Sequence, residues 1–137
     1  MKRFMHRYAI AALLAILSTA SSAFASDWVT VGVDNEGNTW LVDKESLVRE
    51  AGTVRAWRRI EFKQTKPYPP NGEPIASVLF LDVTNCSRRM VGVKASKLIR
   101  RDGSLITAHE DADADVKWVS VAPDTVVEKG MRFVCSL

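Results

Sequence analysis

The stretch TVRAWRRIEFK, residues 53–63, carries the alternation that decides the fold. Val54, Ala56 and Ile60 lie on one face of this segment when it is extended, and mostly charged side chains lie on the other. A repeat of two residues is typical of a strand whose sheet is buried on one side. The sequence therefore predicts a half-buried strand over residues 53–63.

Two residues break the alternation of this strand. Arg58 interrupts the apolar face, and Trp57 stands among the charged residues of the other face. The break indicates a bulge or a second buried surface.

Further apolar segments separated by turn signals predict more antiparallel strands on both sides of it. Asp102-Gly103 is the strongest hairpin signal in the chain. Residues 66–74 contain four prolines, so they are expected to form a loop. Residues 75–84 are apolar on both faces, which predicts that another element covers the second face. The expected strands are residues 27–33, 39–42, 53–63, 75–84, 88–101 and 105–110.

The C-terminal segment is expected to be the covering helix. Thr125 and Glu128 have the spacing of a capping box, in which each side chain satisfies a free backbone N–H of the first turn. An apolar stripe follows at helical spacing and includes Val127, Met131, Val134 and Cys135. Gly130 inside this helix costs about 1 kcal/mol relative to alanine. The fold class is therefore α+β and mainly β, with about six antiparallel strands and one C-terminal helix.

The chain has two cysteines, Cys86 and Cys135, so only one intramolecular disulfide is possible. Cys135 lies on the apolar stripe of the helix, and we expect a structural disulfide that ties the helix to the sheet. Two free buried thiols and a redox pair are the alternatives. The spacing of the cysteines does not resemble a CxxC redox motif.

Residues 1–25 have the pattern of a secretory signal peptide. A basic start precedes ten apolar residues, and small residues precede the expected cleavage between Ala25 and Ser26. Loss of Lys2, Arg3 and Arg7 leaves 16 basic against 16 acidic residues in the mature chain, residues 26–137. A chain without net positive charge gives no electrostatic reason to expect binding to nucleic acid or to an anionic membrane.

We expect the mature chain to be a single exported domain without a membrane span. A bacterial lipoprotein has cysteine as its first mature residue, and Ser26 stands there, so no lipid anchor is expected. The expected location is the periplasm, with secretion or cell-surface exposure as alternatives.

Several residues in chain order resemble those of a known family. They are Trp28, the segment 42–47, Gly52, Trp57, Cys86, Trp118, Val121, Pro123, Thr125, Glu128 and Cys135. The set resembles the surface-adhesin protein E-like domain family of Gram-negative bacteria, over residues 27–135. The resemblance implies a six-stranded antiparallel sheet whose concave side carries a C-terminal helix held by a disulfide. It also implies surface adhesion to matrix and plasma proteins and, for the protein that gives the family its name, haem binding and dimerisation.

Three arginine pairs and one tryptophan are the candidate binding surface. They are Trp57, Arg58, Arg59, Arg88, Arg89, Arg100 and Arg101. On adjacent strands, alternate members would share a face and could bind an acidic protein, a glycan or phosphate. The alternative is an exposed face on which the arginines pair with the equally numerous acids. Trp57 is the tryptophan we expect to be exposed, because it lies on the otherwise charged face of its strand, and aromatic residues frequently anchor interfaces.

No catalytic or metal-ligating set emerges from the remaining residues. Asp111, Asp113 and Asp115 have the spacing that opens an EF-hand loop, but Val116 and Ala122 occupy the positions that need glycine and glutamate. His109 is the only histidine of the mature chain, and no serine has a glycine-flanked elbow. We expect no catalytic residue, no metal site and no cofactor.

The sequence thus predicts a non-catalytic exported binding or structural domain of the bacterial envelope. Its partner is expected to be a protein or glycan of the envelope, and homodimerisation stays open. The alternatives are an adhesin for host matrix or plasma proteins, and a small periplasmic enzyme or enzyme inhibitor.

Overall fold

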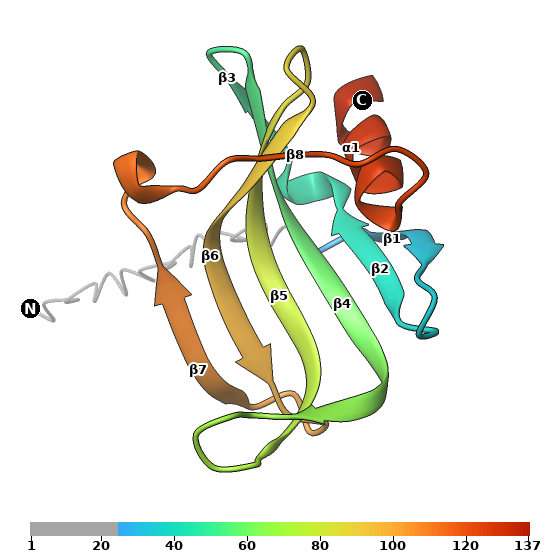
Figure 1. Ribbon diagram of the computed structural model, residues 1–137, viewed down its shortest axis with the longest axis vertical. Helices are drawn as coiled ribbons and strands as arrows, with labels where there is room; N and C mark the ends of the chain where they lie inside the picture. The colour runs from blue at the N-terminus through green and yellow to red at the C-terminus, as the bar shows by residue number, and fades with distance from the viewer. Residues whose placement is uncertain (1–24) are drawn as a thin grey trace, which may run out of the picture.

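The computed structural model describes residues 25–137, which form one antiparallel sheet and one α-helix (Figure 1). The predicted signal peptide lies outside the described residues, except for Ala25. The strands of the described part are β1 (Trp28–Val33), β2 (Thr39–Asp43), β3 (Val48–Glu50), β4 (Thr53–Pro67), β5 (Pro74–Asn85), β6 (Met90–Ile99), β7 (Leu105–Glu110) and β8 (Val119–Ser120). The helical elements are the 3-10 turns η1 (Lys44–Ser46) and η2 (Asp113–Asp115) and the helix α1 (Val126–Ser136).

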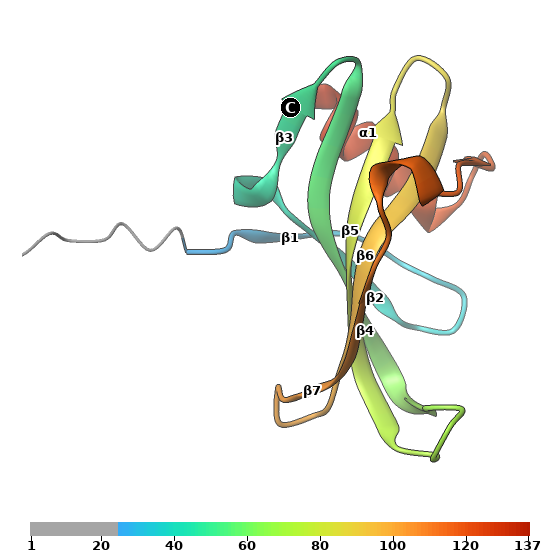
Figure 2. The same cartoon turned by 90° about the vertical axis from the view of Figure 1, so that its left-hand side faces the viewer.

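The sheet has a central antiparallel hairpin made of β4 and β5. The strand order is β1-β2-β4-β5-β6-β7, with β3 paired to β4 and β8 paired to β6. Figure 2, which shows the sheet nearly edge-on, shows how strongly β4 and β5 curve. The six strands of the main path are the six that the sequence predicts, and β3 and β8 are short additions. The mainly β fold class is thereby confirmed.

Alternation along β4 gives the sheet two different faces. Val54, Ala56 and Arg58 are buried at 3%, 2% and 1% exposure, and the residues between them are half-buried. Val54 and Ala56 pack in one cluster with Val134 of α1. We call this side of the sheet the helix face and the opposite side the outer face.

The apolar stripe of α1 packs as the sequence predicts. Val134 packs with Val42 and Ala56 of the sheet, and Met131 packs with Val91. The helix therefore covers the helix face over β2, β4 and the start of β6.

Half of the predicted capping box is present at the start of α1, because the Glu128 carboxylate binds the N–H of Asp124 and not that of Thr125. The Thr125 hydroxyl accepts a hydrogen bond from the Glu128 N–H at 3.2 Å, and the Glu128 carboxylate accepts one from the Asp124 N–H at 2.7 Å. Arg89 and Arg132 reach the other oxygen of Glu128 at 2.6 Å and 3.1 Å. The hydrogen bond from Arg89, followed by the one from the Asp124 backbone, lowers the pKa of Glu128 to about 2.

The connection between β7 and α1 passes in front of the sheet (Figure 1). Its strand β8 pairs with the start of β6, where Val91 lies opposite Val119. A side chain at Gly92 would place its Cβ 2.5 Å from a methyl group of Val116, so glycine allows this close approach. The connection and α1 together supply the cover that the sequence requires for one face of β5.

The boundaries of three predicted strands, β4, β5 and β6, differ from the structure. β4 continues to Pro67 and β5 begins at Pro74, so the proline-rich loop is shorter than residues 66–74. β2 pairs with β4 only as far as Glu61, and beyond it Lys63 donates its N–H to the Asn38 side chain and not to a strand. An edge tolerates proline because no neighbour requires its missing N–H.

The strand predicted over residues 88–101 is limited to Met90–Ile99 because turns occupy both ends.

The predicted disulfide between Cys86 and Cys135 is confirmed. It joins the end of the β5 region to the last turn of α1, across a sequence separation of 49 residues. The covalent link therefore fixes the C-terminal end of the helix to the sheet.

Reduction of this disulfide should lower the free energy of unfolding by about 4 kcal/mol, because the closed loop restricts the unfolded chain. The measurement is thermal and chemical denaturation of the oxidised protein and of the Cys86→Ala/Cys135→Ala variant. Equal stability of the two forms would contradict a stabilising role for the bond.

Candidate functional site

A groove of about 970 Å³ opens on the helix face beside α1. Its floor comes from β4, β5 and β6, and its sides come from Val127 of α1 and from the connection that includes Lys117 and Val119. Most of its lining is apolar and includes Trp40, Ile60, Val78, Phe80 and Val93. Its polar lining includes Arg58, Asp82, Ser96, His109, Asp111, Asp115 and Lys117. A concave, mostly apolar site with a few polar groups is the usual form of a ligand pocket.

The register of the sheet brings the floor residues together. Arg58 lies opposite Phe80, which lies opposite Ser96, which lies opposite His109. Because side chains alternate between faces, residues directly opposite each other project from the same face. This cross-strand row therefore places side chains of β4, β5 and β6 on the floor of the groove and His109 of β7 at its rim.

A buried ion pair between Arg58 and Asp82 lies at this floor. The two residues are 1% and 3% exposed, and Arg58 Nε lies 2.8 Å from Asp82 Oδ2. Arg58 Nη2 and Asp82 Oδ1 are buried and have no hydrogen-bond partner. Burial raises the pKa of the Asp82 carboxyl to about 6, although the positive charge of Arg58 acts in the opposite direction. Arg58 Nε also has no hydrogen-bond partner, so the pair is a close contact between charges without hydrogen-bond geometry.

Gly130 of α1 lies directly against the guanidinium group of Arg58. A Cβ at Gly130 would lie 2.5 Å from Arg58 Nη1 and 3.1 Å from its Cζ. The glycine that weakens the helix in the sequence is therefore the residue that lets the helix backbone approach the buried arginine.

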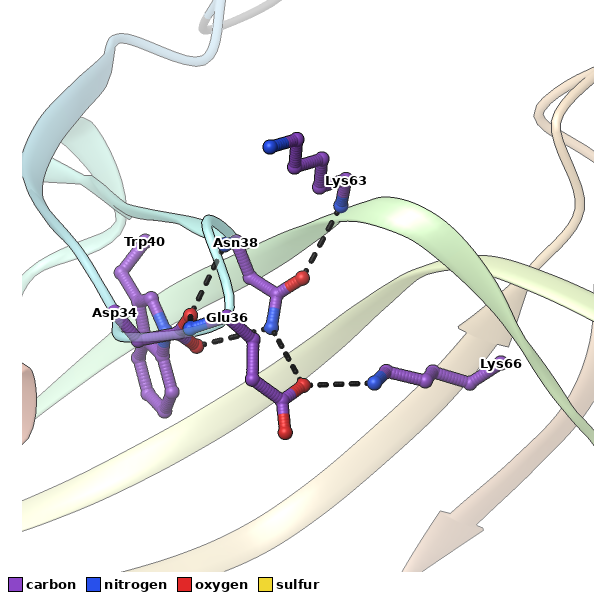
Figure 3. Close-up of polar contacts among 6 residues, drawn as sticks. All are labelled: Asp34, Glu36, Asn38, Trp40, Lys63 and Lys66. Atoms are coloured by element: carbon purple, nitrogen blue, oxygen red, sulfur yellow. Dashed lines mark hydrogen bonds and ion pairs between the residues drawn. The ribbon is translucent and has the colours of Figure 1, made fainter.

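Trp40 is held at one end of the groove by the β1–β2 turn (Figure 3). Asp34 accepts hydrogen bonds from the Trp40 indole at 2.9 Å and from the side chain of Asn38 at 3.0 Å. The indole contact is the largest of the influences that lower the pKa of Asp34 to about 2. Asn38 in turn accepts the backbone N–H of Lys63 at 3.1 Å, and so fixes the turn to β4.

The arginine pair of β4 is divided between the two faces of the sheet. Arg58 lies in the groove, whereas Arg59 lies on the outer face, 4.6 Å from the ring centre of Trp28. Trp57 is half-buried on the outer face, where the Lys97 ammonium lies 5.3 Å from its ring centre. Trp57 is therefore less exposed than expected.

The other two arginine pairs lie at opposite ends of β6. Arg88 and Arg89 precede this 10-residue strand, and Arg100 and Arg101 follow it. Such a strand is about 33 Å long. Arg89 is paired with Glu128, and Arg100 lies 2.6 Å from Glu73. The three pairs therefore do not form one basic patch. Binding of a partner by Trp57 and the exposed arginines stays a prediction.

The acidic run after β7 forms pairs within its own surroundings. His109 Nε2 lies 2.8 Å from Asp111 Oδ1, and Lys94 forms an ion pair with Asp113. The hydrogen bond from Lys94 lowers the pKa of Asp113. Residues 25–137 contain no group of three or more His, Cys, Asp or Glu placed to hold a metal ion.

The groove is not among the predicted features, although the sequence holds a signal for it. Arg58 and Asp82 are charged residues on strand faces that are otherwise apolar. Two opposite charges that interrupt the buried faces of adjacent strands indicate a buried pair. The turn between the two strands implies that β4 and β5 are adjacent. This adjacency would bring Arg58 and Asp82 together.

The fold is that of a small antiparallel sheet with one helix fixed to it by a disulfide. The chain belongs to the family described as surface-adhesin protein E, whose model matches residues 28–136. No helix within residues 25–137 has the length and apolar character needed to cross a membrane.

Solved structures of Haemophilus influenzae protein E share this fold. One has a TM-score of 0.56 and 14% sequence identity, and the match covers 80% of this chain and 83% of that chain. Another, from non-typeable Haemophilus influenzae, has a TM-score of 0.55 and 15% identity, with 84% and 79% covered. No curated protein sequence matches this chain significantly.

An alanine at position 130 should destabilise the protein, although alanine is the better helix former by about 1 kcal/mol. The new Cβ would overlap the Arg58 guanidinium, which is buried and ion-paired and cannot move without cost. Overpacking of this kind costs about 1–3 kcal/mol, so Gly130→Ala should lower the free energy of unfolding by about 1 kcal/mol.

The measurement is urea denaturation of Gly130→Ala, with Lys129→Ala as the control at the neighbouring exposed position of the same helix. The control should change stability by less than about 0.5 kcal/mol. A Gly130→Ala variant more stable than the wild type would show that helix propensity outweighs the contact with Arg58.

Proposed function

We propose that this chain is a non-catalytic binding domain of the bacterial envelope that holds a ligand in the groove on the helix face. The observation that supports the proposal most is the groove itself, which is concave, mostly apolar and has a volume of about 970 Å³. A ligand gains affinity by burying its apolar surface against such a lining.

The chemistry of the groove favours binding over catalysis. The Arg58 guanidinium is paired with the carboxylate of Asp82. His109 is paired with Asp111 at the rim and is 71% exposed, so it is not part of a nucleophile–base pair on the floor. The membership of the surface-adhesin protein E family also supports a binding role.

A photocrosslinking amino acid in the groove should capture the ligand in living cells. Val93 and Val48 are matched positions because they are 44% and 42% exposed valines on strands, and only Val93 lines the groove. We expect p-benzoylphenylalanine at position 93 to give an adduct of defined mass on the exported protein. The same residue at position 48 should give none.

The adduct is detected by intact mass spectrometry of the protein purified from the envelope fraction. Adducts of equal yield at both positions, or none at position 93, would contradict a ligand site in the groove.

The location of the protein is a separate part of the proposal. The sequence of residues 1–25 supports export, and the expected site of action is the periplasm. Added protease should therefore cleave the protein only after the outer membrane is permeabilised, as judged by immunoblotting of cells. Cleavage on intact cells would contradict the periplasmic location and favour an adhesin that faces the host.

A further inference from the structure

We propose that the open edge of β7 binds an extended, basic segment of a partner protein, which adds an antiparallel strand to the sheet. The segment forms backbone hydrogen bonds with Ala108 and Glu110 and carries a lysine or arginine near the Glu110 carboxylate. The inference concerns the backbone edge of the sheet and does not depend on a ligand in the groove.

β7 is the outermost strand on one side of the sheet (Figure 1). Within residues 25–137 it pairs with β6 alone, so its other side is an open strand edge. An open edge presents unpaired N–H and C=O groups to which another chain can add a strand. Main-chain hydrogen bonds then supply the affinity for an extended peptide.

The hydrogen-bond pattern of β7 shows which of its backbone groups face outward. Asp111 donates its N–H to the carbonyl of Lys94 at 2.8 Å, so these residues form a hydrogen-bonded pair of the antiparallel ladder. The register runs without a shift from this pair to Thr107. Because hydrogen-bonded and non-bonded pairs alternate, the N–H and C=O groups of Ala108 and Glu110 point away from β6. Two donors and two acceptors are therefore directed outward.

β7 has few of the features that prevent pairing at an edge. Natural edge strands are commonly blocked by proline, by lysine or by a bulge. Residues 105–110 contain no proline and no lysine, and their one irregularity is at Ile106, where the register with β6 shifts. Ala108 is exposed, and its side chain is too small to obstruct a neighbouring strand. The segment from Thr107 to Glu110 is therefore regular and accessible.

The charge beside this edge determines the character of the partner. Residues 105–115 contain four acidic residues and no lysine or arginine. Asp113 is paired with Lys94, whereas Glu110 is exposed and forms no ion pair within residues 25–137. A basic segment complements these charges. A second copy of this chain would bring the same acidic residues to the contact and is disfavoured by their repulsion.

The position of Glu110 determines which end of the segment is basic. Glu110 is the last residue of β7, so the N-terminal end of an antiparallel strand lies beside it. Antiparallel pairing is slightly more stable per residue than parallel pairing, and it continues the arrangement of the whole sheet. The bound segment is therefore expected to begin with a basic residue.

The test compares the peptide acetyl-KTVTVT-amide with its reversed sequence, acetyl-TVTVTK-amide. The disulfide-bonded mature protein is titrated with each peptide, and the amide NMR signals and hydrogen exchange of Ala108 and Glu110 are followed. We expect the first peptide to bind about fivefold more tightly than the second and to slow the exchange of both amides. Equal affinities would overturn the antiparallel orientation. Unchanged exchange, or no shift with either peptide, would overturn pairing at the edge.

A proline at position 108 tests the backbone contact directly. Its missing N–H is not needed by β6, so Ala108→Pro should fold, as judged by its thermal transition, and should bind the first peptide at least ten times more weakly. Ala108→Val is the matched control, because it keeps the N–H and favours a strand, and it should bind like the wild type. A folded Ala108→Pro protein with wild-type affinity would overturn the inference.

A peptide methylated on every valine and threonine nitrogen decides the matter if Ala108→Pro does not fold. This peptide cannot donate backbone hydrogen bonds from these residues, so wild-type protein that binds it as tightly as the unmethylated peptide would overturn pairing at the edge.

A change of charge tests the role of Glu110. The wild-type protein should bind acetyl-KTVTVT-amide more tightly than acetyl-ETVTVT-amide, and Glu110→Lys should reverse this order. An unchanged order in the folded variant would overturn selection by this residue. Sedimentation of the protein alone tests the alternative occupant, because a dimer that Ala108→Pro dissociates would show that a second copy of the chain fills the edge and would overturn the partner segment.

Discussion

The buried ion pair between Arg58 and Asp82 sets the geometry of the whole helix face. Removing two charges from water costs several kcal/mol for each ion, and their attraction offsets this cost only where the surroundings hold them close together. The surroundings here are the adjacent strands β4 and β5 below and the backbone of α1 at Gly130 above. The helix must approach closely enough to exclude water from Arg58, and only a residue without a side chain at position 130 allows this distance.

A helix that covers a charged group gains less from apolar burial than one that covers a uniform core. The structure compensates by fixing α1 at both ends. The disulfide of Cys135 holds the last turn, and the contact between Glu128 and Arg89 holds the first turn. Arg49 also donates a hydrogen bond to the backbone carbonyl of Val134 at 3.0 Å. The side of the groove formed by α1 is therefore held in place independently of any ligand.

The sequence predicts the elements of this fold well because their signals are local. Two of these signals, the alternation of residues 53–63 and the helix start at Thr125 and Glu128, involve residues close together in the sequence. The two cysteines allow a single intramolecular pairing. The short strands β3 and β8 escape prediction because pairing partners, rather than propensity, create strands of three and two residues.

The site is harder to predict because it depends on register. Arg58 and Asp82 are 24 positions apart, and they meet because β4 and β5 pair with Ala56 opposite Asp82. A shift of one residue in this pairing would place Asp82 on the outer face. Arg58 and Arg59 show the same dependence, because adjacent residues of a strand project from opposite faces of the sheet.

The residues that mark the family and the residues that line the groove are separate sets. Asp43 and Ser46 organise the η1 turn, where Asp43 accepts the N–H of Glu45 at 3.2 Å and Ser46 accepts the N–H of Trp57 at 2.8 Å. Thr125 and Glu128 begin the helix, and the cysteines fix it. None of the family-marking residues lines the groove. These residues therefore describe the scaffold, and one scaffold can carry sites for different ligands. At 14% identity to Haemophilus influenzae protein E, the ligand of this chain has to be inferred from its own groove residues.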